Sequence, residues 1–135
     1  MQRDHFALDR PEDLPVVFRS MVEKRDRGLL VWTSPFIWTH RTQIVDLAAK
    51  HRIAVIYEGA GWVEAGGLMS YGTSTVALWR RTASYVDKIL KGVKPADLPI
   101  EQPSKLEFII NLKVAKALGL KIPQPLLLRA DRVID

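Results

Sequence analysis

The sequence predicts an α/β fold, a parallel β-sheet covered by helices on both faces. Short apolar runs, the length of buried strands, alternate along the chain with longer stretches in which apolar residues recur at helical spacing. The resulting order is helix, strand, helix, strand, loop, strand and helix, which is typical of a parallel sheet. The chain has 135 residues, 47% of them hydrophobic, which suits a domain with a core of its own.

A proline and a glycine delimit the first helix. Pro11 suits the first turn of a helix, and apolar residues then recur at helical spacing until Gly28. The apolar run 29–32 has the composition of a buried strand, and the proline-containing segment 33–36 breaks it. Trp32 lies inside this run, so we expect it to be a core residue.

The middle of the chain repeats this alternation. Thr39 can cap a helix that leads into a second buried strand at 53–57. The Gly-rich segment 58–67 is expected to be a loop, and 68–71 is expected to be a third strand. Tyr57 lies inside the second strand and is therefore expected in the core.

A long amphipathic helix follows the third strand. Thr73 or Ser74 can cap it and Gly92 stops it. Its apolar residues, Trp79 among them, are expected to face the core. The proline-rich segment 94–103 is expected to be extended and to cross the molecule. The remaining elements are a strand, a short helix and a last helix, expected at 106–110, at 111–118 and after Pro125.

Charge and cysteine content exclude several classes of function. The net charge is +5, and the tight basic pairs, Lys24-Arg25 and Arg80-Arg81, lie on predicted helices, where solvated helix faces explain them better than a nucleic-acid interface does. The chain has no cysteine, which excludes disulfides and thiol nucleophiles. No stretch reaches the length of a membrane span, and the polar N-terminus lacks the apolar segment of an export signal. As written, the chain is expected to stay in the cytoplasm.

Two short patterns suggest enzymes, but both are incomplete. Gly59 and Gly61 follow a predicted strand, as in a dinucleotide-binding fingerprint, but Glu64 stands where the third glycine belongs. Ser70 precedes Gly72, as in a hydrolase nucleophile elbow, but the matching glycine before the serine is absent. We therefore expect no catalytic residues.

The three histidines do not indicate a catalytic or metal site. His5, His40 and His51 have no metal-ligand spacing. All three precede Ser70, whereas the histidine of a hydrolase triad with a nucleophile elbow follows the serine. We expect neither a metal nor a cofactor.

Aromatic and polar side chains gather at the three predicted strand ends. Open α/β sheets bind ligands beyond the carboxyl ends of their strands, in apolar pockets with a few polar groups. Glu58 can pair with an ammonium group, and Ser34 can donate to a carboxylate. The aromatic residues can stack on an apolar ligand, although packing in the core is the alternative for each. The candidate ligand-binding residues are Ser34, Phe36, Glu58, Trp62 and Tyr71.

A set of motifs extends from the third strand to the end of the chain. It comprises Ala65-Gly66-Gly67-Leu68-Met69-Ser70-Tyr71-Gly72, Tyr85-Val86-Asp87-Lys88-Ile89-Leu90-Lys91-Gly92, the segment 94–103, and further matches between 111 and 134. With these motifs the chain resembles the ABC-transporter substrate-binding proteins that include the tryptophan-binding type. The resemblance implies a type I periplasmic-binding-protein fold, in which two Rossmann-like lobes joined by hinge strands close over a small solute.

The resemblance also implies a division of the chain. Residues 1–135 would be a single partial unit, in which 9–64 form the βα core of the C-terminal lobe. Residues 65–97 would be a strand and a long helix that cross toward the missing lobe, and 98–135 a hinge segment and C-terminal helices. Because such proteins have an N-terminal lobe and an export signal, we expect a truncated member.

The function implied is that of a solute-binding component of an ABC importer, without enzymatic activity. Such a protein binds a small solute, such as an amino acid, between its lobes in the periplasm and presents it to a membrane permease. The alternative is a stand-alone flavodoxin-like interaction or regulatory domain without transport function. Exposed lobe surface would favour a homo-oligomer in the first case, and a stable monomer would favour the alternative.

Overall fold

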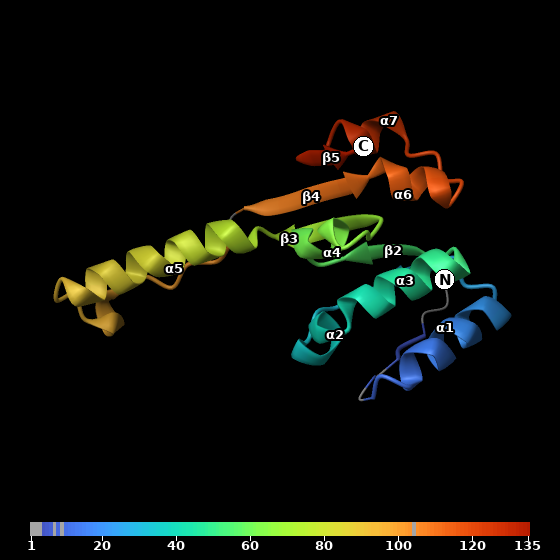
Figure 1. Ribbon diagram of the computed structural model, residues 1–135. Helices are drawn as coiled ribbons and strands as arrows, with labels where there is room; N and C mark the ends of the chain where they lie inside the picture. Colours follow the sequence, from blue (N-terminus) through green and yellow to red (C-terminus); the bar gives the residue numbers. More distant parts are fainter. Residues whose placement is uncertain (1–3, 7, 9, 104) are drawn as a thin grey trace.

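A body and a projecting arm make up the computed structural model, which describes residues 4–6, 8, 10–103 and 105–135 (Figure 1). The arm consists of helix α5 (Thr75–Leu90) and the returning segment 91–103, which includes the 3₁₀ turn Pro95–Asp97. The other elements form the body: α1 (Asp13–Glu23), β1 (Gly28–Leu30), α2 (Pro35–Thr39), α3 (Arg41–His51), β2 (Ala54–Tyr57), α4 (Ala60–Glu64), β3 (Met69–Thr73), β4 (Leu106–Asn111), α6 (Leu112–Ala117), α7 (Gln124–Leu127) and β5 (Arg132–Ile134).

The body contains a five-stranded sheet in the order β1-β2-β3-β4-β5. Strands β1, β2 and β3 are parallel, as the sequence predicts. Strand β4 is antiparallel to β3 and parallel to β5. This reversal follows from the arm, because the chain leaves the body at the end of β3 and re-enters beside it. The amide of Ser74 bonds to the carbonyl of Lys105 at 3.1 Å and closes the base of the arm.

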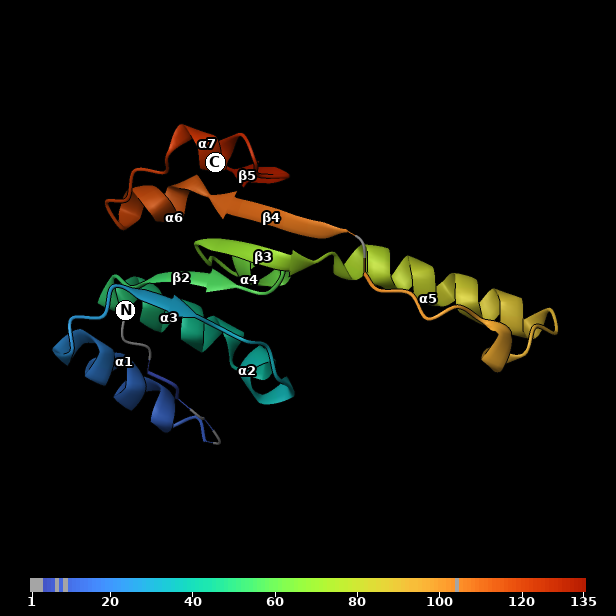
Figure 2. The ribbon, with the colours of Figure 1, turned by 180° about the vertical axis from the view of Figure 1, so that it is seen from behind.

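Helices α1, α3 and α4 all pack on one face of strands β1–β3. The core cluster joins apolar residues of α1 and α3 to Trp62 of α4 and to Val55 and Tyr57, which alternate along β2. Figure 2 shows the strands from the opposite side, in front of α3 and α4. The expected coverage of both faces by these connecting helices is therefore wrong. The reason is topological: right-handed crossovers between strands that are also neighbours in the sheet place every connecting helix on the same side.

Caps and glycines bound several helices where the sequence predicts. The side chain of Asn111 accepts a bond from the amide of Val114 at 3.1 Å and begins α6. Gly92 and Gly119 adopt left-handed φ angles of 96° and 73° after α5 and α6. These positions confirm the predicted helix ends.

Short elements depart most from the sequence prediction. The expected loop 58–67 contains the short helix α4, and the expected break at 33–36 contains the start of α2. Strand β5 was not expected at all, and α7 is a single turn that begins one residue before Pro125. Elements of one turn carry too few residues to display a helical period, so periodicity does not reveal them.

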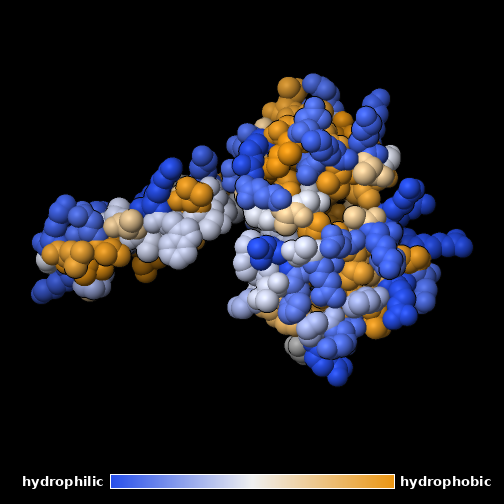
Figure 3. Space-filling view, viewed as in Figure 1, coloured by the Kyte–Doolittle hydropathy of each residue, from blue (hydrophilic) through white to orange (hydrophobic). Residues whose placement is uncertain are grey.

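The arm differs from the body because α5 has no buried residue. Trp79, expected in the core, is 68% exposed. Figure 3 shows hydrophobic side chains gathered along the projecting arm. Within the described part of the chain, no helix combines the length and hydrophobicity needed to cross a membrane.

Candidate ligand-binding site

Hydrogen bonds tie together the loops that follow β1 and β2. The carboxylate oxygen Oε2 of Glu58, directly after β2, accepts the backbone N–H of Thr33, after β1, at 2.9 Å. The hydroxyl oxygen of Thr33 in turn accepts the indole N–H of Trp62 at 3.2 Å. Glu58 is exposed, and this contact uses only one of its two carboxylate oxygens. The structure thus holds the carboxylate of Glu58 at the carboxyl edge of the sheet, directly after β2, which is the position that the sequence predicts.

A close approach of β3 to Glu58 fixes the third strand end. A Cβ atom on Gly72 would lie only 1.7 Å from the carbonyl oxygen of Glu58. Any larger residue at position 72 would therefore have to displace the backbone that carries the Glu58 carboxylate. The glycine is required here by close packing.

Ser34 and Phe36 occupy the start of α2. The hydroxyl oxygen of Ser34 accepts the N–H of Ile37 at 3.2 Å, so Ser34 is the N-cap of this helix. The hydroxyl proton of Ser34 is not used in that bond and can be donated to a ligand. The ring of Phe36 is half-buried and lies 4.5 Å from the ring of His40, centroid to centroid. Both residues thus sit beside the loop that follows β1.

Trp62 lies inside the body, with no exposed ring face. Its side chain is 0% exposed, stacks on Tyr57 with ring centroids 4.7 Å apart, and meets Trp38 edge-on. The stacking role that the sequence suggested requires an accessible ring face, which Trp62 lacks in this structure. The cause is α4, which turns the residue inward. Through its bond to Thr33, Trp62 instead supports the loop that holds Glu58.

Two exposed aromatic side chains border the strand ends. Tyr71 of β3 is 53% exposed and meets Phe108 of β4 edge-on. Trp32, expected in the core, lies two residues after the end of β1 at Leu30 and is 69% exposed. The alternation along the chain carries this signal. Val31 belongs to the core cluster and Leu29 packs against it, so their neighbours Leu30 and Trp32 point away from the core.

The site is therefore an open surface with one fixed carboxylate, one hydroxyl donor and exposed aromatic rings. This combination can bind an ammonium group and an apolar side chain. Burial raises the pKa of Tyr57, so its phenol stays protonated and neutral beneath the site. Among the described residues the hydroxyl of Ser70 is buried without any hydrogen-bond partner, so no base activates it. Glu64 pairs with Arg132 at 2.8 Å and does not join the site.

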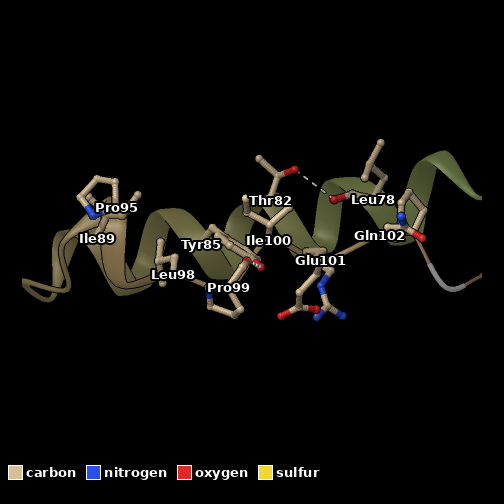
Figure 4. Close-up of a pocket in the computed structure, with 12 residues that line it drawn as sticks. Leu78, Thr82, Tyr85, Ile89, Pro95, Leu98, Pro99, Ile100, Glu101 and Gln102 are labelled. Atoms are coloured by element: carbon tan, nitrogen blue, oxygen red, sulfur yellow. Dashed lines mark hydrogen bonds and ion pairs between the residues drawn. The ribbon is translucent and has the colours of Figure 1, made fainter.

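A groove of about 500 Å³ lies along the arm, away from the strand ends. Figure 4 shows the returning segment running beside α5, with Leu98, Pro99 and Ile100 next to Tyr85. The Tyr85 hydroxyl donates to the carbonyl of Pro99 at 2.7 Å, and Arg81 forms an ion pair with Glu101. The groove is thus the seam between two pieces of the arm, and its polar groups already bond to each other.

The sequence matches the profile of a known family along almost all of its length. Residues 4–134 match the family described as ABC transporter substrate binding protein. No curated protein matches the sequence.

Three solved structures are similar to the chain. The ABC domain from Streptococcus pneumoniae in complex with L-Trp shares 28% identity and a TM-score of 0.84, over 96% of this chain and 43% of that one. The ligand-free, open structure of CD0873 from Clostridium difficile, a substrate-binding protein with adhesive properties, shares 26% identity and a TM-score of 0.66, over 94% and 42%. A conserved domain protein from Vibrio cholerae shares the fold, with 24% identity and a TM-score of 0.79, over 90% and 41%. The chain thus spans less than half the length of each of these proteins.

Proposed function

Because the chain belongs to the ABC transporter substrate-binding protein family, we propose that it is a solute-binding component of an ABC importer. Its strand-end surface forms one wall of an inter-lobe cleft, and its partners are a small solute and a membrane permease. Members of this family typically work outside the cytoplasm, and the location proposed for this component is the periplasm. No reaction is catalysed.

The anchored carboxylate of Glu58 is the observation that carries this proposal. A carboxylate held by a backbone N–H is oriented before a ligand arrives, so binding does not have to restrict it further. The free oxygen of Glu58 pairs with an ammonium group, and the Ser34 hydroxyl donates to a carboxylate. Phe36 and Tyr71 supply apolar contacts, with Trp32 as an additional exposed ring. Trp62 contributes from beneath by holding Thr33 in place.

The solute that fits these groups is an amino acid with an apolar or aromatic side chain. It offers the ammonium, the carboxylate and the apolar surface that the site complements. The similar structure from Streptococcus pneumoniae, in complex with L-Trp, supports the same class of ligand. L-Tryptophan is therefore the first solute to test.

The arm supports a division of the chain between two lobes. Residues 9–64 belong to the lobe that carries the site, 65–97 pass from β3 into α5 toward the other lobe, and 98–135 return through a hinge segment. The exposure of α5, which has no buried residue, fits a helix whose packing surface lies in that other lobe. The same exposure argues against a stand-alone flavodoxin-like domain, whose helices would pack on its own sheet.

Calorimetric titration of the chain joined to the N-terminal lobe of the Streptococcus pneumoniae relative tests the proposal. The Glu58→Gln variant keeps an oxygen for the Thr33 amide and removes only the charge, so we expect L-tryptophan affinity to fall by about 10- to 100-fold. Phe36→Ala is expected to weaken binding by about tenfold through lost apolar contact.

Glu64→Gln is the matched control, because it removes an exposed carboxylate that pairs with Arg132 away from the strand ends. Its affinity should equal that of the parent chain. If Glu58→Gln and Phe36→Ala both bind L-tryptophan and a panel of other amino acids as the parent does, the assignment of this surface is wrong.

A further inference from the structure

The end of the body that lies away from the arm carries the net positive charge of the chain. Three segments meet there, 24–27 after α1, 50–52 at the end of α3 and 113–121 in and after α6, and both ribbon views show these helix ends on the same side (Figures 1 and 2). Together the segments hold eight basic residues and a single acidic one, whereas the whole chain has a net charge of +5, so the rest of the chain is slightly acidic. We call this surface the basic pole, and its basic residues are Lys24, Arg25, Arg27, Lys50, Arg52, Lys113, Lys116 and Lys121.

Packing contacts bring the three segments of the basic pole together. The N–H of Ala54, at the start of β2, bonds to the carbonyl of Arg27 at 3.2 Å, which joins the end of α1 to the end of α3. Ala49 and Ile53, around the end of α3, line one small cavity together with Leu118, at the end of α6. The sequence alone does not reveal the pole, because its members lie far apart along the chain.

The basic side chains of the pole are available to a partner. All eight belong to exposed residues. Lys24 forms an ion pair with Asp4. Among the residues that the structure describes, none of the other seven lies within ion-pair distance of a carboxylate. The pole therefore presents a surplus of cations to the solvent.

Two arginines of the pole occupy backbone positions that favour glycine. Helices α1 and α3 both end in the Schellman arrangement, in which an N–H bonds back to the carbonyl five residues earlier. The N–H of Asp26 bonds to the carbonyl of Met21 at 2.8 Å after α1, and the equivalent bond after α3 measures 3.0 Å. The residue that caps such an end takes a left-handed conformation, and Arg25 and Arg52 have φ angles of 60° and 54°.

The other two helices that end in this way use glycine. Gly92 after α5 and Gly119 after α6 hold the equivalent positions. Among the described residues, Arg25 and Arg52 are the only residues other than glycine with a positive φ, and both lie in the basic pole. A side chain in this conformation lowers stability relative to glycine. Arginine at both positions is expected where the guanidinium group serves a purpose other than stability.

We propose that the basic pole binds the anionic headgroups of a phospholipid bilayer. The choice of a membrane rests on the proposed function, because a permease partner holds the chain next to a bilayer. Each lysine or arginine near an anionic membrane surface adds to the attraction. Guanidinium groups can also donate two parallel hydrogen bonds to one phosphate group.

The pole fits an extended anionic surface better than a single small anion or a nucleic-acid strand. Its cations are spread over three helix ends, and the cavity between α3 and α6 measures only about 10 Å³, which is too small for a phosphate group. His51 is the only ring in the three segments, and it stacks on Phe18. The pole thus offers no free ring on which nucleic-acid bases could stack.

Cosedimentation of the full chain with vesicles tests the proposal. Vesicles made of equal parts of phosphatidylglycerol and phosphatidylcholine should bind the chain at low ionic strength. Raising the salt concentration from about 0.05 M to about 0.5 M should release it, because salt screens the attraction. Vesicles of phosphatidylcholine alone should not bind it. Failure to bind the anionic vesicles, or binding that salt does not weaken, would overturn the proposal.

A double variant then separates the pole from the net charge of the chain. Arg25→Gly combined with Arg52→Gly removes two guanidinium groups and gives both helix ends the residue that their backbone favours. Affinity for the anionic vesicles should fall by about tenfold or more, while the melting temperature should rise by a few degrees. Arg80→Gln combined with Lys88→Gln is the matched control, because it removes the same charge from exposed positions of α5 and should change vesicle affinity far less.

Equal losses in the two double variants would show that net charge drives binding, and would overturn the assignment to the pole, as would unchanged binding in the glycine variant. The Glu58→Gln variant, which tests the solute site, should bind vesicles as the parent chain does, since Glu58 lies at the opposite edge of the sheet. Vesicle binding needs no solute and the solute titration needs no vesicles. Failure of this proposal is therefore distinguishable from failure of the proposed function.

Discussion

Two tryptophans show how differently the body and the arm are built. Trp62 lies on a short helix that the sequence hardly predicts, yet its side chain is 0% exposed. Trp79 lies on the longest and most amphipathic helix of the chain, yet it is 68% exposed. Amphipathic spacing therefore shows that a helix has an apolar face to bury, but it does not show which molecule or segment buries it.

The energetic consequence is that the body has a hydrophobic core that stabilises it, whereas helix α5 of the arm buries no residue. The body packs Trp62, Tyr57 and the helices α1 and α3 into a single core cluster. The arm is held by two exposed contacts, the Tyr85–Pro99 hydrogen bond and the Arg81–Glu101 ion pair, and by the backbone hydrogen bond between Ser74 and Lys105 at its base. Such contacts contribute about 1 kcal/mol or less each.

The largest predicted effect comes from truncating each tryptophan in turn. Trp62→Ala removes a fully buried ring that stacks on Tyr57, so the free energy of unfolding should fall by about 3–5 kcal/mol. Trp79→Ala should change the unfolding of the body by less than about 0.5 kcal/mol. Urea unfolding followed by circular dichroism measures both, at low protein concentration so that association adds nothing.

Similar losses for the two variants would break the distinction between body and arm. A large loss for Trp79→Ala alone would mean that α5 folds back onto the sheet in solution. Leu78→Ala serves as a further check, because this residue lies on the groove side of the same helix and should also leave the body unchanged.

Most of the fold of the body follows from the sequence because its signals are local. Apolar runs predict β1, β2, β3 and β4 within a few residues, and Asn111, Gly92 and Gly119 mark helix ends by their own backbone chemistry. The course of the arm was only partly predictable. The prolines of 94–103 indicate an extended crossing segment, but the burial of α5 depends on contacts that no local pattern encodes.

The positions of the polar residues of the candidate site could be predicted from the sequence, whereas the orientation of its aromatic residues could be predicted only in part. Glu58 and Ser34 follow directly from their positions after strands, and the structure places both at the carboxyl edge of the sheet. The short helix α4 directs Trp62 inward, and Trp32 faces away from the core because it alternates with the buried Val31. Whether these residues bind a solute stays a prediction.

Tyr57 provides the next prediction, which again separates the body from the arm. Burial raises the pKa of Tyr57 above its ordinary value of 10.0. The unfolded chain therefore releases this proton above about pH 10 while the folded chain retains it, so the contribution of Tyr57 to the free energy of unfolding is constant below that pH and falls above it. The slope should approach about 1.4 kcal/mol per pH unit. Urea unfolding at a series of alkaline pH values measures it.

Tyr57→Phe should remove this decline, because phenylalanine keeps the stacking on Trp62 and has no proton to lose. Tyr85→Phe is the control from the arm, and it should leave the decline in place. A decline of the same slope in Tyr57→Phe would show that another group is responsible.

The smallest expected effect concerns a buried serine of the body and an exposed serine of the arm. The hydroxyl of Ser70 is buried in β3 and has no hydrogen-bond partner among the described residues. On folding, this hydroxyl loses its hydrogen bonds to water and gains none in return. Ser70→Ala removes that cost, so the free energy of unfolding should rise by about 1 kcal/mol. Ser84→Ala, in the arm, removes an exposed hydroxyl that donates to Arg81 and should leave the unfolding of the body unchanged. A loss of stability in Ser70→Ala would instead mean that the hydroxyl makes a bond in solution, and that the interior of the sheet is more polar at β3 than its packing indicates.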